Sequence, residues 1–167
     1  PVVRHYNEDV LMAAKFPQHL NWDQYWSDLV KTYQDACDIA ADHGLTYQMH
    51  PCLGVMSAST DAFLYFAQAV NRPNLRFNLD TANQFFGKDN LMLSLIRLKD
   101  YIDYIHISDN RGHKVEHLVP GEGKINWDNF FSTLNSINFK GHIGIDVGGP
   151  ESGIQNLNEA YITTATW

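Results

Sequence analysis

The stretch that decides the fold class runs from Leu75 to Asn110 and reads LRFNLDTANQFFGKDNLMLSLIRLKDYIDYIHISDN. Two apolar runs, Leu75–Leu79 and Ile102–Ile107, have the length and composition of strands that are covered on both faces. Between them, apolar residues from Asn90 to Leu98 recur at helical spacing. Strands joined by a crossover helix lie parallel in one sheet, so this stretch predicts an α/β fold.

The same alternation of strands and helices continues on both sides of this stretch. Upstream, the pattern predicts a helix over Trp22–His43, a strand over Leu45–His50, and a helix that begins near Ser59 or Thr60 and carries Val70. Downstream it predicts a helix that starts near Trp127 and carries Ile137, a strand over His142–Val147, and a helix over Leu157–Ala165. One helix followed by four strand–helix units fits either a small doubly wound sheet or part of a (β/α)₈ barrel.

Composition restricts the partners of the chain. The chain has 167 residues, 44% of them hydrophobic, which suits one domain with a core of its own. Its net charge of −7 argues against a nucleic-acid surface and against an anionic membrane, so we expect a small-molecule substrate, no nucleic acid and no membrane. Two cysteines make no disulfide framework, which predicts a reducing, cytoplasmic location.

A polar side chain with metal-ligating atoms stands at the end of each predicted strand. These residues are His50, Asp80, His106 and Asp146. Taken singly, they could be a loop residue, a helix cap, a buried core histidine and a turn residue. Because parallel strands end at one edge of a sheet, the four side chains are expected to converge there, and a divalent cation would relieve the repulsion between the carboxylates.

A long polar loop, residues 108–124, follows the third predicted strand. Gly121 and Gly123 allow tight turns and close approach to a ligand. His117, Arg111 and His113 could bind polar groups of a substrate. Ordinary solvated loop chemistry is the other interpretation, and we expect it for His113 and Glu116.

Three stretches of the chain resemble the xylose isomerase-like TIM-barrel superfamily, the sugar phosphate isomerase/epimerase group. They are residues 75–83, residues 104–110, and residues 117–127, of which the last resembles the family loop H-x-x-P-G-x-G-x-I-x-W. The resemblance extends from Trp22 to Pro150. It implies a partial (β/α)₈ barrel, strands five to eight with their helices. The whole chain, residues 1–167, would then be a single C-terminal part of such a domain and a fragment of a longer chain.

The resemblance also implies a site. The family holds one divalent metal with Glu, Asp, His and Glu on strands five to eight, which correspond here to His50, Asp80, His106 and Asp146. Asp80 and His106 match in kind, whereas His50 and Asp146 replace the two glutamates that also move the proton. The metal would be Mn, Co, Mg, Fe or Zn. The substrate-binding residues would be His117, Arg111, Asn83 and Asp109.

The activity implied is that of an isomerase or epimerase in carbohydrate metabolism. It would act on a small sugar or polyol-derived carbonyl compound through a metal-stabilised enediolate, with His50 and Asp146 as the catalytic residues. The alternatives are an inosose dehydratase-like lyase and a catalytically impaired sugar-binding homologue. An endonuclease IV-type activity is opposed by the negative charge. Half a barrel leaves sheet edges unpaired, so we expect a homo-oligomer or completion by an upstream half.

Overall fold

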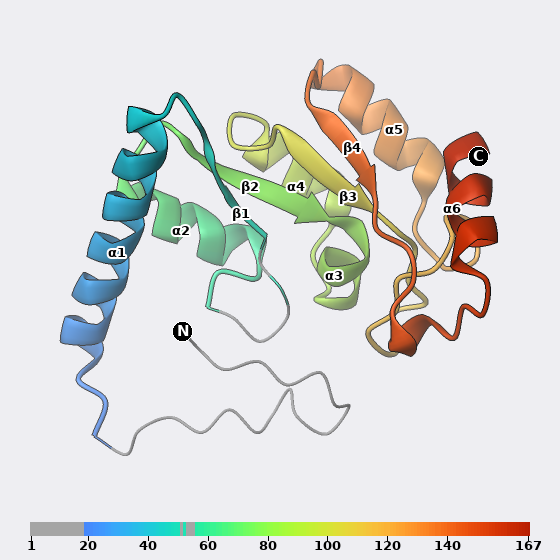
Figure 1. The fold of residues 1–167 in the computed structure, drawn as a ribbon, viewed down its shortest axis with the longest axis horizontal. Helices are drawn as coiled ribbons and strands as arrows, with labels where there is room; N and C mark the ends of the chain where they lie inside the picture. Colours follow the sequence, from blue (N-terminus) through green and yellow to red (C-terminus); the bar gives the residue numbers. More distant parts are fainter. Residues whose placement is uncertain (1–18, 51, 53–55) are drawn as a thin grey trace. The chain divides into compact units, whose positions relative to one another are not determined.

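The computed structural model describes residues 19–50, 52 and 56–167, which fall into two compact units, one up to Arg76 and one from Phe77 onward. Figure 1 shows the strands and helices of both units. Among the described residues, no helix combines the length and the apolar composition that crossing a membrane requires.

The first unit is built from α1 (Trp22–Asp42), β1 (Tyr47–Met49) and α2 (Thr60–Val70). Each helix begins where a polar side chain accepts a hydrogen bond from the first turn: Asn21 caps α1 and Ser59 caps α2. The chain leaves α1 through Gly44 at φ +69°, a left-handed conformation that glycine adopts without strain. Phe66 of α2 packs edge-on against Tyr33 of α1, with ring centroids 4.9 Å apart.

The second unit contains most of the sheet. Its strands are the greater part of β2 (Leu75–Asp80), β3 (Tyr104–Ile107) and β4 (His142–Ile145). Its helices are α3 (Thr81–Phe86), α4 (Leu91–Leu98), α5 (Trp127–Ser136) and α6 (Leu157–Thr166), and a 3₁₀ turn, η1 (Pro150–Ser152), precedes α6. β2 pairs with β3 and β3 with β4, all parallel. The α/β prediction is therefore confirmed.

Strand order distinguishes the two architectures that the sequence left open. The order along the sheet is β1-β2-β3-β4, so each new strand is added on the same side. A doubly wound sheet reverses direction at a switch point, whereas a barrel does not. The order therefore favours the partial (β/α)₈ barrel.

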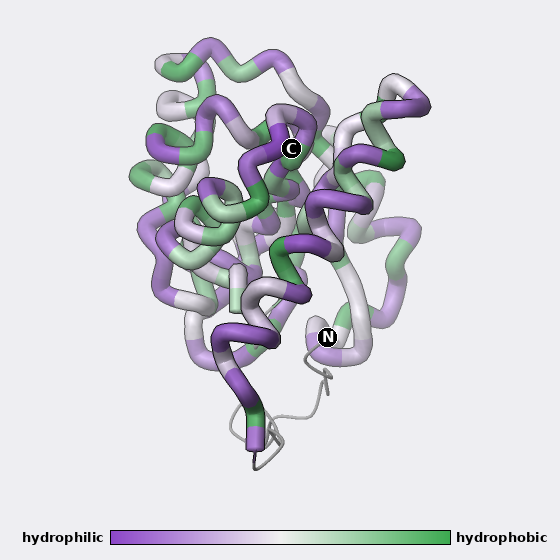
Figure 2. The backbone as a smooth tube through the Cα atoms, turned by 90° about the vertical axis from the view of Figure 1, so that its left-hand side faces the viewer, coloured by the Kyte–Doolittle hydropathy of each residue, from purple (hydrophilic) through white to green (hydrophobic). Residues whose placement is uncertain are grey.

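The core of the second unit lies between the sheet and its helices. Leu79 of β2, Ile105 of β3, Leu95 of α4 and Phe130 of α5 have no exposed surface. Burying a side chain of this size contributes about 1.5–3 kcal/mol. Along the helices of Figure 2, hydrophilic and hydrophobic positions alternate with the helical turns, as expected where one face of a helix is buried.

The element bounds differ most from the predicted ones at β1, α3 and β4. β1 is shorter than predicted, because only residues 47–49 are in strand conformation. α3 was not predicted and begins directly after β2, since Asp80 ends the strand and caps the helix. β4 ends at Ile145, and His142 and Ile143 are exposed, so this strand is not covered on both faces as the apolar run suggested.

Candidate metal centre

Asp80 stands at the carboxyl end of β2, and its carboxylate is buried. It is the N-cap of α3, where Oδ1 accepts a hydrogen bond from the Asn83 backbone N–H at 3.0 Å, and Oδ2 accepts one from the Asn83 side-chain amide. The side chain is 1% exposed. A buried carboxylate needs such donors or a cation. Its lone pairs allow it to accept these hydrogen bonds and to coordinate a cation as well. Asn83, predicted to bind substrate, thus orients Asp80.

His106 lies beside Asp80 because β2 and β3 pair in parallel with these two residues in register. The Asn78 amide nitrogen lies 3.3 Å from His106 Nε2, and His106 Nδ1 lies 3.3 Å from Asp146 Oδ2. Asn78 and Asp146 therefore hold the ring of His106 from its two sides. Asn78 was not among the predicted site residues.

Asp146 follows β4 directly and is half-buried. Its backbone N–H donates to the Ile107 carbonyl at 3.0 Å, which continues the sheet by one residue and aims the side chain at the strand ends. The hydrogen bond from His106 holds the pKa of Asp146 below its usual value, although burial and the nearby Asp80 act to raise it. The carboxylate is therefore ionised at neutral pH.

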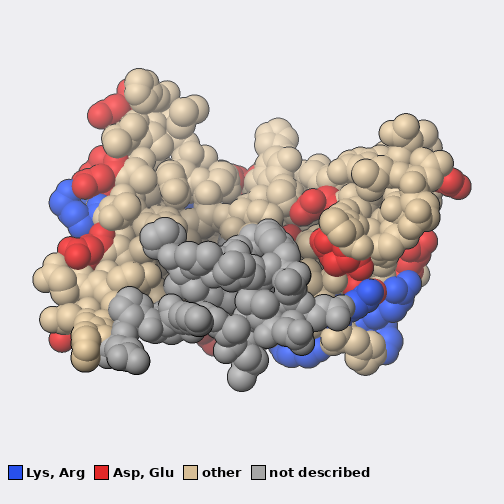
Figure 3. All heavy atoms as spheres, turned by 60° about the horizontal axis from the view of Figure 1, so that its bottom comes forward, with Lys and Arg blue, Asp and Glu red and all other residues tan. Residues whose placement is uncertain are grey.

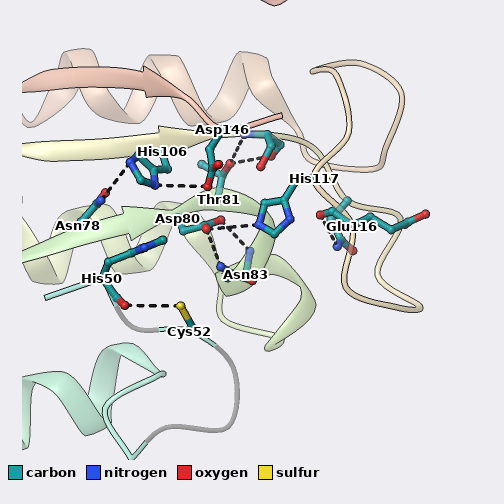
Figure 4. A network of polar contacts seen from close by, with 12 residues as sticks. His50, Cys52, Asn78, Asp80, Thr81, Asn83, His106, Glu116, His117 and Asp146 are labelled. Carbon is teal, nitrogen blue, oxygen red and sulfur yellow. Dashed lines mark hydrogen bonds and ion pairs between the residues drawn. The ribbon is translucent and has the colours of Figure 1, made fainter. Parts of the chain in front are cut away.

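Asp80, His106 and Asp146 thus meet at one edge of the sheet. Each offers a ligand atom, and these atoms lie within 4.8 Å of one another. Figure 4 shows the three side chains pointing toward one another beyond the ends of the strands. Two carboxylates and one imidazole at this spacing fit a divalent cation of the Mn, Fe, Co or Zn type, for which mixed nitrogen and oxygen ligands are suited.

His50 belongs to the first unit, where it directly follows β1 and is exposed. Its carbonyl accepts a long, weak hydrogen bond from the Cys52 thiol. Its place as the fourth ligand remains a prediction from the sequence, based on the rule that parallel strands end at one edge.

His117 projects from the long loop onto Asp80. Its Nε2 lies 3.5 Å from Asp80 Oδ2, its Nδ1 lies 3.1 Å from Glu151 Oε1, and its side chain is 12% exposed. Burial alone would lower the pKa of His117, but the contact with Asp80, the charge of Asp146 and the hydrogen bond to Glu151 raise it to about 9. The sequence predicted His117 to bind substrate but gave no role to Glu151.

Asp109 organises the loop. Its side chain is fully buried and accepts hydrogen bonds from three backbone N–H groups and from the Trp127 indole N–H; the three backbone donors are Asn110, Gly121 and Ile125. Both carboxylate oxygens are bonded within the loop, and the substrate contact of Asp109 stays a prediction from the sequence. A β-carbon at Gly123 would lie 2.6 Å from the Asn110 nitrogen, so this position requires glycine.

Arg111 and Glu116 form an ion pair within the same loop. Arg111 Nη1 lies 2.9 Å from Glu116 Oε1, and the Arg111 backbone N–H donates to Oε2 at 3.2 Å. The expectation that Glu116 is solvated was wrong, because the residue is 1% exposed. Its burial is offset by the guanidinium and by the backbone donor. The predicted substrate contact of Arg111 would have to share a guanidinium that Glu116 already holds.

Comparison with known proteins identifies the class. The family model described as "Xylose isomerase-like TIM barrel" matches residues 3–167, so the chain belongs to the xylose isomerase-like TIM-barrel family. Among solved structures, the chain is similar to a xylose isomerase domain protein from Planctomyces limnophilus, with 26% identity and a TM-score of 0.70 over 92% of this chain and 54% of that one. The fold predicted from the sequence is confirmed.

Curated relatives give the range of activities in the family. The chain is 30% identical over 124 residues to an uncharacterized protein, MJ1614, of Methanocaldococcus jannaschii (71% of this chain, 46% of that one). It is 28% identical to an L-ribulose 3-epimerase of Methylomonas sp. (68% and 39%) and 24% identical to an inosose dehydratase of Erwinia tasmaniensis (74% and 48%). The chain thus spans less than half of the length of each of these relatives.

Proposed function

We propose that this chain forms the metal-binding part of a divalent-metal-dependent sugar isomerase or epimerase. The observation that carries the proposal is the meeting of Asp80, His106 and Asp146 at the ends of three adjacent parallel strands, with ligand atoms within 4.8 Å of one another. The kinship with an L-ribulose 3-epimerase supports a small ketose as the substrate class. A cation bound there would polarise the substrate carbonyl and make the neighbouring C–H bond more acidic.

The proton transfer is assigned to His50 and Asp146, as the sequence predicts. One of them takes the proton from the carbon beside the carbonyl, and the other returns a proton to the opposite face of that carbon, which inverts its configuration. Asp146 is half-buried and ionised, so its carboxylate can accept a proton, although the hydrogen bond from His106 lowers its basicity. Its side chain is one methylene shorter than the glutamate of the family pattern, so the substrate must lie closer to β4.

The other residues of the site orient the ligand side chains or can contact the substrate. Asn83 orients the Asp80 carboxylate, and Asn78 orients the His106 ring. His117 brings a ring N–H to the Asp80 side of the site, where it can donate to a substrate oxygen. On the face drawn in Figure 3, most of the basic side chains of the described residues gather at the lower right, and acidic side chains lie on both sides of the view.

Metal binding is the first test of the proposal. The 167-residue chain, stripped with a chelator and dialysed, is titrated calorimetrically with Mn²⁺, Co²⁺ and Zn²⁺. We expect one cation per chain. The variants Asp80→Ala and His106→Ala should lose affinity by at least the roughly 10–100-fold that the loss of an outer-shell partner costs. Asp128→Ala and His113→Ala are matched controls, because both residues are exposed. Equal affinity in all four variants would contradict the proposal.

Turnover in D₂O is the second test and also separates the epimerase from the lyase. The metal-loaded chain is incubated with L-ribulose, D-allulose and an inosose, and the products are followed by NMR. An epimerase incorporates deuterium at the carbon beside the carbonyl and keeps the mass otherwise unchanged. The relationship to an inosose dehydratase favours loss of water as the second candidate reaction. If the chain binds the metal but forms neither product, the remaining candidate is the catalytically impaired sugar-binding homologue.

A further inference from the structure

The loop that follows β4 folds back onto the site through two glycines. Gly148 and Gly149 have φ values of +118° and +81°, and the Gly148 N–H donates to the His117 carbonyl at 2.9 Å. A β-carbon at Gly149 would lie 2.7 Å from the carboxyl carbon of Glu151. The missing side chain at Gly149 therefore makes the space in which the Glu151 carboxylate lies.

The carboxylate placed in this way contacts one side of the His117 ring. Glu151 Oε1 lies 3.1 Å from Nδ1, while Asp80 Oδ2 lies 3.5 Å from Nε2 on the other side. Glu151 is 30% exposed and His117 12% exposed, so the contact is shielded from water on the histidine side. An imidazole held at both nitrogens has its ring plane fixed.

We propose that Glu151 is a positioning residue, which acts through His117 by holding Nδ1 so that Nε2 faces Asp80 and the substrate oxygen next to it. The inference rests on the proposed function, since it gives His117 a substrate oxygen to contact. Glu151 itself is not a metal ligand in this arrangement, because its carboxylate lies on the far side of the ring from Asp80. The ligand group that His117 recognises is a hydroxyl or carbonyl oxygen, which accepts from a ring N–H.

A purely structural role for Glu151, as an anchor of its own loop, predicts different results. Removing an anchor would loosen the loop and lower stability but would not change the ring of His117 specifically. The decisive measurement is therefore made on the histidine ring. Long-range ¹H–¹⁵N NMR of the metal-free chain reports the environment of each ring nitrogen, and it needs no substrate and no metal.

Three variants make the comparison. Glu151→Ala removes the acceptor, and Glu151→Gln keeps an oxygen that can accept from Nδ1–H. Glu159→Gln is the control, because Glu159 lies in α6, where its carboxylate accepts from Asn156. We expect the Nδ1 signal of His117 to move in Glu151→Ala, to move less in Glu151→Gln, and to stay unchanged in Glu159→Gln. A His117 spectrum that is identical in Glu151→Ala and in the unmodified chain would overturn the proposal.

Activity and metal binding complete the test. With Mn²⁺ and the ketose that gives turnover, Glu151→Ala should lower kcat by about tenfold or more while the affinity for Mn²⁺ changes by less than about threefold. In a His117→Ala background, Glu151→Ala should have no further effect, because it acts through that ring. Fully additive losses would overturn the positioning role. Absence of any turnover would contradict the proposed function, while the NMR comparison would still decide the role of Glu151.

Discussion

Replacing Asp109 by alanine is expected to destabilise the chain strongly, although the residue lies in a loop. The Asp109 carboxylate accepts four hydrogen bonds at 2.8–3.1 Å, and its side chain has no exposed surface. Removing it leaves four N–H groups without their acceptor. The change therefore tests whether the loop is held by this one carboxylate.

The four donors differ in how easily water can replace the carboxylate. Gly121 is exposed, so its N–H can bind water, whereas Asn110, Ile125 and Trp127 are buried. A buried donor without an acceptor costs about 1–3 kcal/mol. Three such donors give a loss of about 3–9 kcal/mol in the free energy of unfolding. Asp109→Asn keeps the volume and one acceptor oxygen, so we expect about half of that loss.

Urea titration followed by tryptophan fluorescence and far-ultraviolet circular dichroism measures the loss. Asp128→Ala is the matched control: Asp128 is exposed in the first turn of α5, where an acidic residue contributes only about 0.3–1 kcal/mol through the helix dipole. If Asp109→Ala costs no more than Asp128→Ala, the loop is held by other contacts and the assignment of Asp109 as its organising residue is refuted.

Three further predictions concern the loop, the cysteines and the pH dependence. Gly123→Ala places a β-carbon 2.6 Å from the Asn110 nitrogen and should cost about 1–3 kcal/mol in the same urea titration; a loss below that range would show that the backbone yields easily. Cys37 is fully buried, and burial raises the pKa of its thiol, so a thiol reagent should label only Cys52 in the folded chain. Labelling of both cysteines at equal rates would contradict this prediction. The pKa of His117 is raised from 6.5 to about 9, so its stabilising effect on the metal-free chain is complete below pH 6.5 and is lost as the pH rises toward 9. His117→Gln should therefore reduce the fall of the free energy of unfolding between pH 6.5 and 9. An unchanged fall would refute the raised pKa of His117.

Local chemistry made several parts of the fold predictable. Asn21 and Ser59 cap the helices whose starts the sequence placed at Trp22 and near Ser59 or Thr60, because capping depends only on the residues of the first turn. The convergence of Asp80, His106 and Asp146 was predictable for a related reason. In a parallel sheet the crossover helices bring successive strand ends to one edge, so the position of a residue along its own strand is enough to place it.

The short helix α3 was not predictable from periodicity, because six residues are too few to show a helical pattern. The sequence left two interpretations of Asp80 open, a helix cap and a functional residue. In the structure, Asp80 caps α3, and this does not prevent a functional role. Oδ1 and Oδ2 accept from Asn83, yet the same carboxylate lies among the ligand atoms at the strand ends. A carboxylate has about four lone-pair positions, so capping a helix leaves capacity for a cation.

The acidic residues of the loops show where sequence reasoning reaches its limit. Asp109, Glu116 and Glu151 occur in polar stretches whose composition indicates solvent, yet the first two are buried and the third contacts His117. Whether a carboxylate in a loop is buried depends on whether the folded loop gathers enough N–H donors around it, and those donors come from residues up to 34 positions away. The glycines were the available signal: Gly123, Gly148 and Gly149 stand where a side chain would collide with Asp109, Leu157 and Glu151, respectively. Gly149, two positions from Glu151 in the sequence, leaves the space for the carboxylate that contacts His117, whereas Glu122, between Gly121 and Gly123, is exposed. A glycine beside an acidic residue therefore indicates an inward carboxylate only where the fold brings the two together in space.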